Sequence, residues 1–349
     1  MKCHEIPFGT LPTGKSVFLY HLENSSGIQA EVISYGGIIH RLVVPDRSGN
    51  MADIVMGQDT LESYVKYPMC SAAVIGRCAN RVAGATFTIN DKTYFLERTM
   101  GDVTLHSGSG NYANKLFTGR LYENGTEAGV ELYYKDDGRG GFPGSMDVWI
   151  TYALNEDGVF EIRYRALPEM DTVINLTNHA YFNLAGHASG PVGSQLLKLE
   201  ADFYLPNDIS GVPTGEVLKV EGTDMDFTSL TPFERGFASS DPQLSRYGGY
   251  DHNFCLRGRG FRKVAEARDP ASGRGMEVLT DLPGLQLYTA NFMRGDTPCK
   301  DGAKYQKRGA FCLETQHFPN AVNQSQFPSP IYLAKQEFNS KTAFRFFTF

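Results

Sequence analysis

Apolar and polar residues alternate with a period of two at several places along the chain. Residues 148–154 place Val, Ile, Tyr and Leu at every second position, and residues 160–165 repeat the pattern after the turn Asn155-Glu156-Asp157-Gly158. Two alternating runs around an Asp-Gly turn predict a β-hairpin. Further hairpins are predicted within residues 86–96 and 262–280, and residues 342–349 are predicted to form a closing strand.

Helical patterns are few and short. Thr60 is a candidate N-cap for a helix over residues 61–65, and Thr231-Pro232-Phe233-Glu234 has the form of a helix start. Strands do not alternate with long helices, which argues against a doubly wound parallel sheet. The loop-rich stretch 202–213 is the best candidate for a domain boundary, but strand patterns resume directly after it. We therefore predict an all-β fold, a large antiparallel β-sandwich that forms a single domain over residues 1–349.

Composition supports the strand-rich reading and excludes some partners. The chain has 37 Gly, 18 Tyr and 23 Phe, as expected for many turns and aromatic strands. Its net charge of −6 argues against a nucleic-acid surface. No apolar run is long enough for a membrane span, and the N-terminal residues do not resemble a secretory signal. The one tryptophan, Trp149, lies within an alternating strand and is predicted to belong to the core.

The cysteines indicate a reducing compartment. They are dispersed and form no C-x-x-C pair, so they are predicted to be free thiols: Cys3, Cys70, Cys78, Cys255, Cys299 and Cys312. We therefore expect a cytoplasmic protein. The sequence leaves open whether the chain is a monomer or a dimer.

Four stretches interrupt the strand pattern with polar residues in apolar surroundings. Residues 76–82 contain two arginines, and His106 precedes a turn. In residues 175–186, alternation places Thr177, His179 and Tyr181 on one face. Glu314 follows three apolar residues in a strand-like run. Each stretch has a structural alternative: surface ion pairs for the arginines, or a buried hydrogen-bond network for the asparagine-rich segment.

These polar groups suit a neutral, polyhydroxylated ligand. Amides and imidazoles pair with hydroxyl groups, and aromatic rings cover C–H surfaces; residues 250–254 and 284–288 add further polar positions among aromatics. The sequence has no G-x-S-x-G nucleophile elbow, no phosphate-binding glycine loop and no dinucleotide fingerprint. Covalent serine catalysis and nicotinamide chemistry therefore have no support.

Taken together, the motifs resemble the aldose 1-epimerase family over residues 9–349. The resemblance rests on eight motifs in the family's order: Gly36-Gly37-Ile38-Ile39, the stretch 76–82, Leu105-His106, Gly141-Phe142-Pro143-Gly144, the stretch 175–186, Tyr250-Asp251-His252-Asn253-Phe254, Gly284-Leu285-Gln286 and Leu313-Glu314-Thr315-Gln316. Ser107 departs from the family's usual Gly, and residues 109–115 are less typical. The resemblance implies a β-supersandwich and the interconversion of the anomers of free aldohexoses such as galactose and glucose.

The resemblance also implies roles for individual residues. Glu314 matches the family's general base and His179 its general acid, and His106 is a second active-site histidine. Asn80, Arg81, Asp251 and Gln286 match hydroxyl-binding positions, and Tyr181 lines the site. Opening and closing a hemiacetal needs one base and one acid, so we expect no metal and no cofactor.

Three alternatives remain open at this level. A hexose-6-phosphate 1-epimerase on the same fold would need basic residues for the phosphate, with Arg77, Arg81 and Lys115 as candidates. A non-catalytic carbohydrate-binding protein would bind sugar without turnover. His106, His179 and Glu314 could instead form a two-His-one-carboxylate metal site, although their separations lack local ligand spacing.

Overall fold

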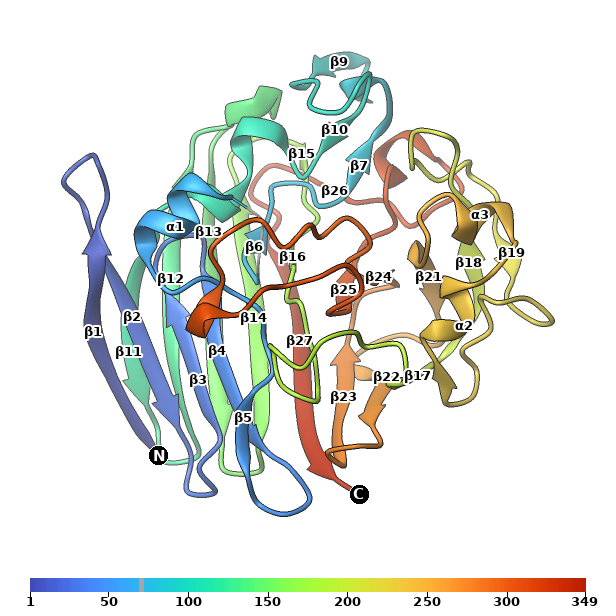
Figure 1. Ribbon diagram of the computed structural model, residues 1–349. Helices are drawn as coiled ribbons and strands as arrows, with labels where there is room; N and C mark the ends of the chain where they lie inside the picture. The colour runs from blue at the N-terminus through green and yellow to red at the C-terminus, as the bar shows by residue number, and fades with distance from the viewer. Residues whose placement is uncertain (69–71) are drawn as a thin grey trace.

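A nine-stranded antiparallel sheet runs through the middle of the molecule (Figure 1). The computed structural model describes residues 1–68 and 72–349. The strands of this sheet are, in spatial order, β11 (Thr118–Glu123), β12 (Glu127–Asp136), β13 (Met146–Asn155), β14 (Val159–Pro168), β27 (Phe338–Thr348), β23 (Arg274–Thr280), β22 (Arg262–Asp269), β17 (Leu196–Leu199) and β20 (Thr231–Pro232). Burial along β14 alternates strictly, because one face of the sheet meets the core and the other meets solvent.

Two five-stranded sheets cover the buried face. The first contains β1 (Lys2–Thr10), β2 (Ser16–Glu23), β3 (Gln29–Ile33), β4 (Ile38–Pro45) and β5 (Met51–Asp53). The second contains β19 (Leu218–Lys219), β18 (Ala201–Leu205), β21 (Asp251–Leu256), β24 (Gly284–Tyr288) and β25 (Cys312–Gln316). Val32 of the first sheet, Leu313 of the second and Ile150 of the nine-stranded sheet belong to one buried apolar cluster. This shared core makes the molecule a large β-sandwich.

Short elements connect the sheets. Four two-stranded pairs complete the strands: β7 (Arg81–Val82) with β10 (Thr104–Leu105), β8 (Thr86–Ile89) with β9 (Lys92–Phe95), β6 (Val74–Ile75) with β16 (Thr177–Asn178), and β15 (Thr172–Val173) with β26 (Ile331–Tyr332). The α-helices of the described residues are α1 (Leu61–Lys66), α2 (Glu234–Phe237) and α3 (Pro242–Ser245). None of the helices in this part of the chain is long and apolar enough to cross a membrane.

Most predicted elements are confirmed, with four corrections. The three hairpins form at β13–β14, β8–β9 and β22–β23, and the Thr60 side chain caps α1 as expected. The closing strand starts earlier than predicted, at Phe338. Residues 231–232 form β20, so the predicted helix begins only at Glu234. The stretch 202–213 is not wholly loop, because its first residues belong to β18.

The fourth correction concerns Trp149, which lies on the outer face of the nine-stranded sheet rather than in the core. Its neighbours Val148 and Ile150 point inward and are fully buried, so alternation turns Trp149 outward. The Arg165 guanidinium lies 3.7 Å from the centre of the indole ring and covers it. The described cysteines are free thiols, as predicted; Cys70 lies outside the described residues.

Candidate active site

A cavity of about 270 Å³ lies against the second five-stranded sheet. All eight residues predicted for the site line it: Asn80, Arg81, His106, His179, Tyr181, Asp251, Gln286 and Glu314. Pro68, Leu105, Tyr288 and Phe292 are the other lining residues in the described part of the chain. The structure therefore brings together side chains that are up to 234 positions apart, from Asn80 to Glu314.

Strand register explains how Asp251, Gln286 and Glu314 come together on one face of the second five-stranded sheet. In β21, β24 and β25, the residues Asn253, Gln286 and Glu314 lie directly opposite one another across the sheet. Residues two positions away in a strand share the same face, so Asp251, Tyr288 and Cys312 form the adjacent row. One face of this sheet is thus a polar floor, while the other, with Leu285 and Leu313, packs into the core.

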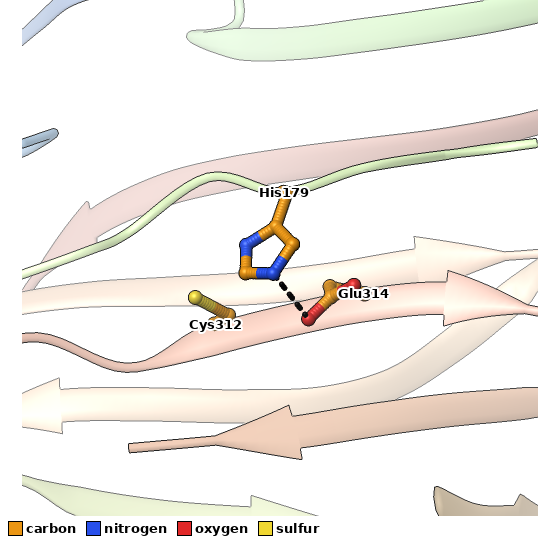
Figure 2. A group of neighbouring side chains, drawn as sticks. All are labelled: His179, Cys312 and Glu314. Atoms are coloured by element: carbon orange, nitrogen blue, oxygen red, sulfur yellow. Dashed lines mark ion pairs between the residues drawn. The ribbon is translucent and has the colours of Figure 1, made fainter. Parts of the chain in front are cut away.

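His179 and Glu314 form a close pair of titratable groups in the cavity. The Nε2 atom of His179 lies 3.5 Å from Oε1 of Glu314 (Figure 2). Glu314 projects from β25, and His179 projects from the irregular segment that follows β16. Glu314 is 2% exposed and His179 is 7% exposed, so both groups are held in a largely water-free environment.

The asparagines around His179 support the backbone rather than lining the cavity. Asn175 donates to the carbonyl oxygens of Ala79 and His317, and Asn178 donates to that of Ala72. The backbone N–H of His179 donates to the Ala73 carbonyl, which fixes the position of the imidazole. The strand ends at Asn178, yet the predicted alternation persists: the rings of His179 and Tyr181 stack with centroids 4.9 Å apart and both face the cavity.

His106 is held by a reciprocal pair of hydrogen bonds with Asn80. The His106 N–H donates to the Asn80 carbonyl, and the Asn80 N–H donates to Nδ1 of His106 over 3.2 Å. Because Nδ1 accepts a hydrogen bond, neutral His106 carries its proton on Nε2. The His106 ring meets the His179 ring edge to face, with centroids 5.5 Å apart.

Arg81, Asp251 and Gln286 form a chain of polar contacts. Nη2 of Arg81 lies 3.3 Å from Oδ2 of Asp251, and Nε2 of Gln286 donates to Oδ1 of Asp251 over 2.8 Å. This chain positions a cation, a carboxylate and an amide at the edge of the cavity. Such groups bind hydroxyls as donors and acceptors.

Burial shifts the pKa values of Glu314, His179 and His106 in the directions that favour their neutral forms. Desolvation raises the pKa of Glu314 well above its usual range; the charge of Asp251 adds to this rise, and Arg81 opposes it. Desolvation lowers the pKa of His179 to about 4, although its own backbone and Asp251 oppose the shift. Desolvation, His179 and Arg81 hold the pKa of His106 well below its usual value.

Aromatic rings form one wall, and sequence reasoning missed two of them. Tyr288 meets Tyr181 edge to face at 6.1 Å, and Phe292 stacks on Tyr288 at 6.3 Å. Tyr288 follows Gln286 by two positions in the same strand, so alternation could have identified it. Phe292 lies in the loop after β24, where strand alternation could not identify it.

Two of the three residues considered for phosphate binding lie elsewhere. Arg77 is buried and donates to Asp136, Thr172 and the carbonyls of Pro143 and Gly144. Lys115 donates to the Ser109 carbonyl. Neither belongs to the described lining of the cavity, whose cation Arg81 already contacts Asp251.

Among the described residues, two groups of side chains have the donor atoms for a metal ion. One is Asp53, His187 and Asp301, but Lys300 Nζ lies 2.6 Å from Asp53 and Arg41 lies 2.7 Å from Asp301, so cations already neutralise it. The other is His179, Cys312 and Glu314, inside the cavity.

Comparison with known proteins gives consistent matches over nearly the full length. The family model described as Aldose 1-epimerase matches residues 19–345. Human galactose mutarotase is 41% identical over 340 residues, which cover 97% of each chain, and aldose 1-epimerase of Haemophilus influenzae is 32% identical over 317 residues, 90% of this chain and 91% of its own. The crystal structure of galactose 1-epimerase from Lactobacillus acidophilus superposes with a TM-score of 0.88 at 23% identity, covering 99% of both chains.

Proposed function

The chain belongs to the aldose 1-epimerase family, isomerases that act on carbohydrates, and we propose that the cavity around His179 and Glu314 is its catalytic site. In this proposal, the protein interconverts the α and β anomers of free aldohexoses such as galactose and glucose. Glu314 is the general base, His179 is the general acid, and the other residues of the cavity hold the sugar. The observation that supports it best is the 3.5 Å pair formed by His179 and Glu314.

The chemistry explains why the acid and base must be neighbours. Ring opening removes the proton from O1, adds one to O5 and breaks the C1–O5 bond, and both oxygens are bonded to C1. The Glu314 carboxylate takes the O1 proton while the His179 imidazolium donates to O5. After rotation about the C1–C2 bond, the same two transfers in reverse close the ring on the other face of the aldehyde. Each group typically contributes about 10²–10⁴ in rate.

Burial of the pair acts on both stages of this exchange. A carboxylate beside an imidazolium holds the same number of protons as a carboxylic acid beside a neutral imidazole, so the two transfers require no net exchange of protons with solvent. Ring opening converts the first arrangement into the second, which is the one that desolvation favours. The same desolvation must be overcome when the charged pair forms before ring opening.

The remaining groups suit a neutral sugar. Arg81, Asp251, Gln286 and Asn80 offer donors and acceptors to hydroxyl groups, and His106 presents its Nε2 proton. The rings of Tyr181, Tyr288 and Phe292 offer an apolar wall for C–H groups. A volume of about 270 Å³ is near the lower end for ligand cavities and suits a single pyranose ring.

We extend the proposal to the domain organisation of the chain and its cellular location. Residues 1–349 act as a single domain, because residues from Asn80 to Glu314 line one cavity and the sheets share a core. The free thiols of the described cysteines favour a cytoplasmic location.

Polarimetry tests the proposed reaction. Fresh α-D-galactose and α-D-glucose are followed to equilibrium with and without enzyme, and the spontaneous rate is subtracted. We expect catalysed mutarotation of the free sugars and much slower conversion of glucose 6-phosphate, because the cation of the described cavity lining, Arg81, already contacts Asp251. Preference for the phosphorylated sugar, or sugar binding without turnover, would contradict the proposal.

A further inference from the structure

Cys312 lies beside the proposed acid and base, although the mechanism does not use it. It precedes Glu314 by two positions in β25, so both side chains project from the same face of the strand toward His179 (Figure 2). One donor atom from each of the three residues lies within 4.8 Å of the others, and all three side chains are buried. A nitrogen, a sulfur and an oxygen donor thus converge on one point.

We propose that His179, Cys312 and Glu314 form an inhibitory binding site for a thiophilic divalent cation, with Zn²⁺ as the best match. The ion would occupy the acid and the base at once, so the enzyme would bind it and lose activity. Binding of the ion stands on the donor set alone, whereas the inhibition rests on the proposed function.

The distances suit tetrahedral zinc. Typical Zn–N, Zn–O and Zn–S bonds of about 2.0, 2.0 and 2.3 Å place nitrogen and oxygen ligands about 3.3 Å apart and nitrogen and sulfur ligands about 3.6 Å apart. The 3.5 Å separation of His179 and Glu314 already meets the first requirement. The second requires the Cys312 thiol to approach by at most about 1.2 Å from the 4.8 Å limit, which is within the reach of a side-chain rotation.

The electrostatics also favour a divalent ion. Oε2 of Glu314 and Nδ1 of His179 are buried and lack a hydrogen-bond partner among the described residues. A thiolate and a carboxylate neutralise Zn²⁺, so the occupied site carries no net charge in its buried setting. Binding releases two protons to solvent, one from the thiol and the one that His179 and Glu314 share. His179 then keeps its neutral-ring proton on Nδ1 while Nε2 binds the ion.

His106 does not complete this site. Its Nδ1 accepts from the Asn80 N–H, so its Nε2 bears a proton and cannot act as a ligand. This differs from the two-His-one-carboxylate set considered from the sequence. The fourth position of the ion therefore faces the cavity, where water or a sugar hydroxyl would bind.

The test titrates Zn²⁺ against the metal-free enzyme and its cysteine variants in the polarimetric assay. We expect reversible inhibition of the wild type that a chelator relieves. Cys312→Ala and Cys312→Ser should retain activity and require at least about tenfold more zinc, since even loss of a supporting contact costs that much affinity. The matched control is Cys299→Ala, which removes another buried thiol that donates to the Thr297 carbonyl. It should be inhibited like the wild type.

Cobalt provides a readout that is independent of activity. Co²⁺ added to the wild type should give a thiolate-to-metal charge-transfer band, which should be absent from both Cys312 variants. Equal zinc sensitivity of the wild type and the Cys312 variants, or a wild type with neither inhibition nor a cobalt band, would overturn the proposal. If the wild type proves inactive on sugars but shows the band, the proposed function fails while the metal site stands.

Discussion

In the proposed mechanism, Glu314 and His179 each transfer a different proton, so each should be indispensable. Glu314→Gln keeps the shape of the side chain but cannot take the O1 proton, and His179→Asn keeps a polar group but cannot donate to O5 as an imidazolium does. We expect each change to lower kcat for mutarotation by about 10²–10⁴. Polarimetry with the spontaneous rate subtracted measures the loss.

The same two variants should remain folded. Burial disfavours the charged form of Glu314, so a neutral amide in its place does not add a desolvation cost. Circular dichroism and the urea midpoint should therefore stay close to those of the wild type. Turnover near the wild-type level in either folded variant would show that the residue has no role in proton transfer.

Phe292 should affect sugar binding more than chemistry. Its ring is 60% exposed, stacks on Tyr288 and lines the cavity. Phe292→Ala removes apolar contact that the sugar makes equally in its ring-closed and ring-opening states, so we expect KM to rise several-fold with little change in kcat. Phe292→Tyr, which keeps the ring, is the matched control. A fall in kcat with KM unchanged would argue against this role.

Single residues show where sequence reasoning was sufficient. The stretches around His179 and Glu314 stood out because imidazole, carboxylate and amide groups are unusual in apolar runs, and the resemblance to the aldose 1-epimerase family then implied the individual site residues. Cys312 and Phe292 were not predicted, since a buried thiol and a loop phenylalanine are ordinary features. Their proximity to the cavity depends on strand register and loop path, which a single sequence does not contain.

The two arginines of residues 76–82 have different structural roles. Arg77 is 1% exposed and ties the segment before β7 to Asp136 at the end of β12, with further bonds to the loop before β13. Arg81, in β7, lies at the cavity and contacts Asp251. Proximity in sequence therefore does not imply a shared role.

Replacing these arginines should separate stability from binding. Arg77→Leu leaves Asp136 buried without its cation and should lower the free energy of unfolding by about 3–5 kcal/mol. Arg81→Leu removes the cation beside Asp251 and should raise KM, with a smaller loss of stability because Gln286 still donates to Asp251. Urea unfolding and steady-state kinetics on both variants test the contrast. A larger loss of stability in Arg81→Leu than in Arg77→Leu, or a larger rise of KM in Arg77→Leu, would contradict it.

Period-two alternation predicted the elements well because most strands have one buried and one solvated face. It gave β13, β14, β22 and β23 almost to their ends. Alternation gave no signal for β25, whose five residues are all buried because one face meets the core and the other the cavity; only the apolar run before Glu314 indicated a strand there. The core prediction for Trp149 rested on its hydrophobicity and was wrong, since alternation turns the ring outward, where the Arg165 guanidinium covers it.

At the scale of the molecule, the fold class followed from the sequence, but the arrangement of layers did not. Repeated strands without long helices indicated a β-sandwich. Nothing in the alternation indicates that the final strand, β27, inserts between β14 and β23 at the centre of the nine-stranded sheet. That pairing joins the two halves of the chain, so it places the strands that form the cavity floor on the same face as the first five-stranded sheet.

The molecule buries several histidines in their neutral form, which should limit its stability in acid. Desolvation lowers the pKa of His40, His252 and His317 to about 4. Lys300 also opposes protonation of His40. Nδ1 of His252 accepts from the Asp251 N–H, and its Nε2 faces the Gln243 carbonyl oxygen, so this ring is satisfied when neutral.

The sign of the effect follows from proton uptake. Between pH 6.5 and pH 4, these histidines are protonated in the unfolded chain but not in the folded protein. The unfolded state therefore binds more protons, and stability is complete above pH 6.5 and falls as the pH drops through this window. Each histidine contributes up to about 1.4 kcal/mol per pH unit, and His106, whose pKa is also lowered, acts in the same direction.

Urea unfolding at pH 7.5, 6.5, 5.5 and 5.0 measures this dependence. We expect a midpoint that is constant above about pH 7 and falls steeply below about pH 6, before carboxylates with ordinary pKa values take up protons. His252→Gln, which can keep a hydrogen bond but does not titrate, should reduce the slope by up to about 1.4 kcal/mol per pH unit. A midpoint that stays constant down to pH 5.0 would mean that the buried histidines become protonated without unfolding. A His252→Gln variant with the wild-type slope would show that His252 does not contribute to the pH dependence.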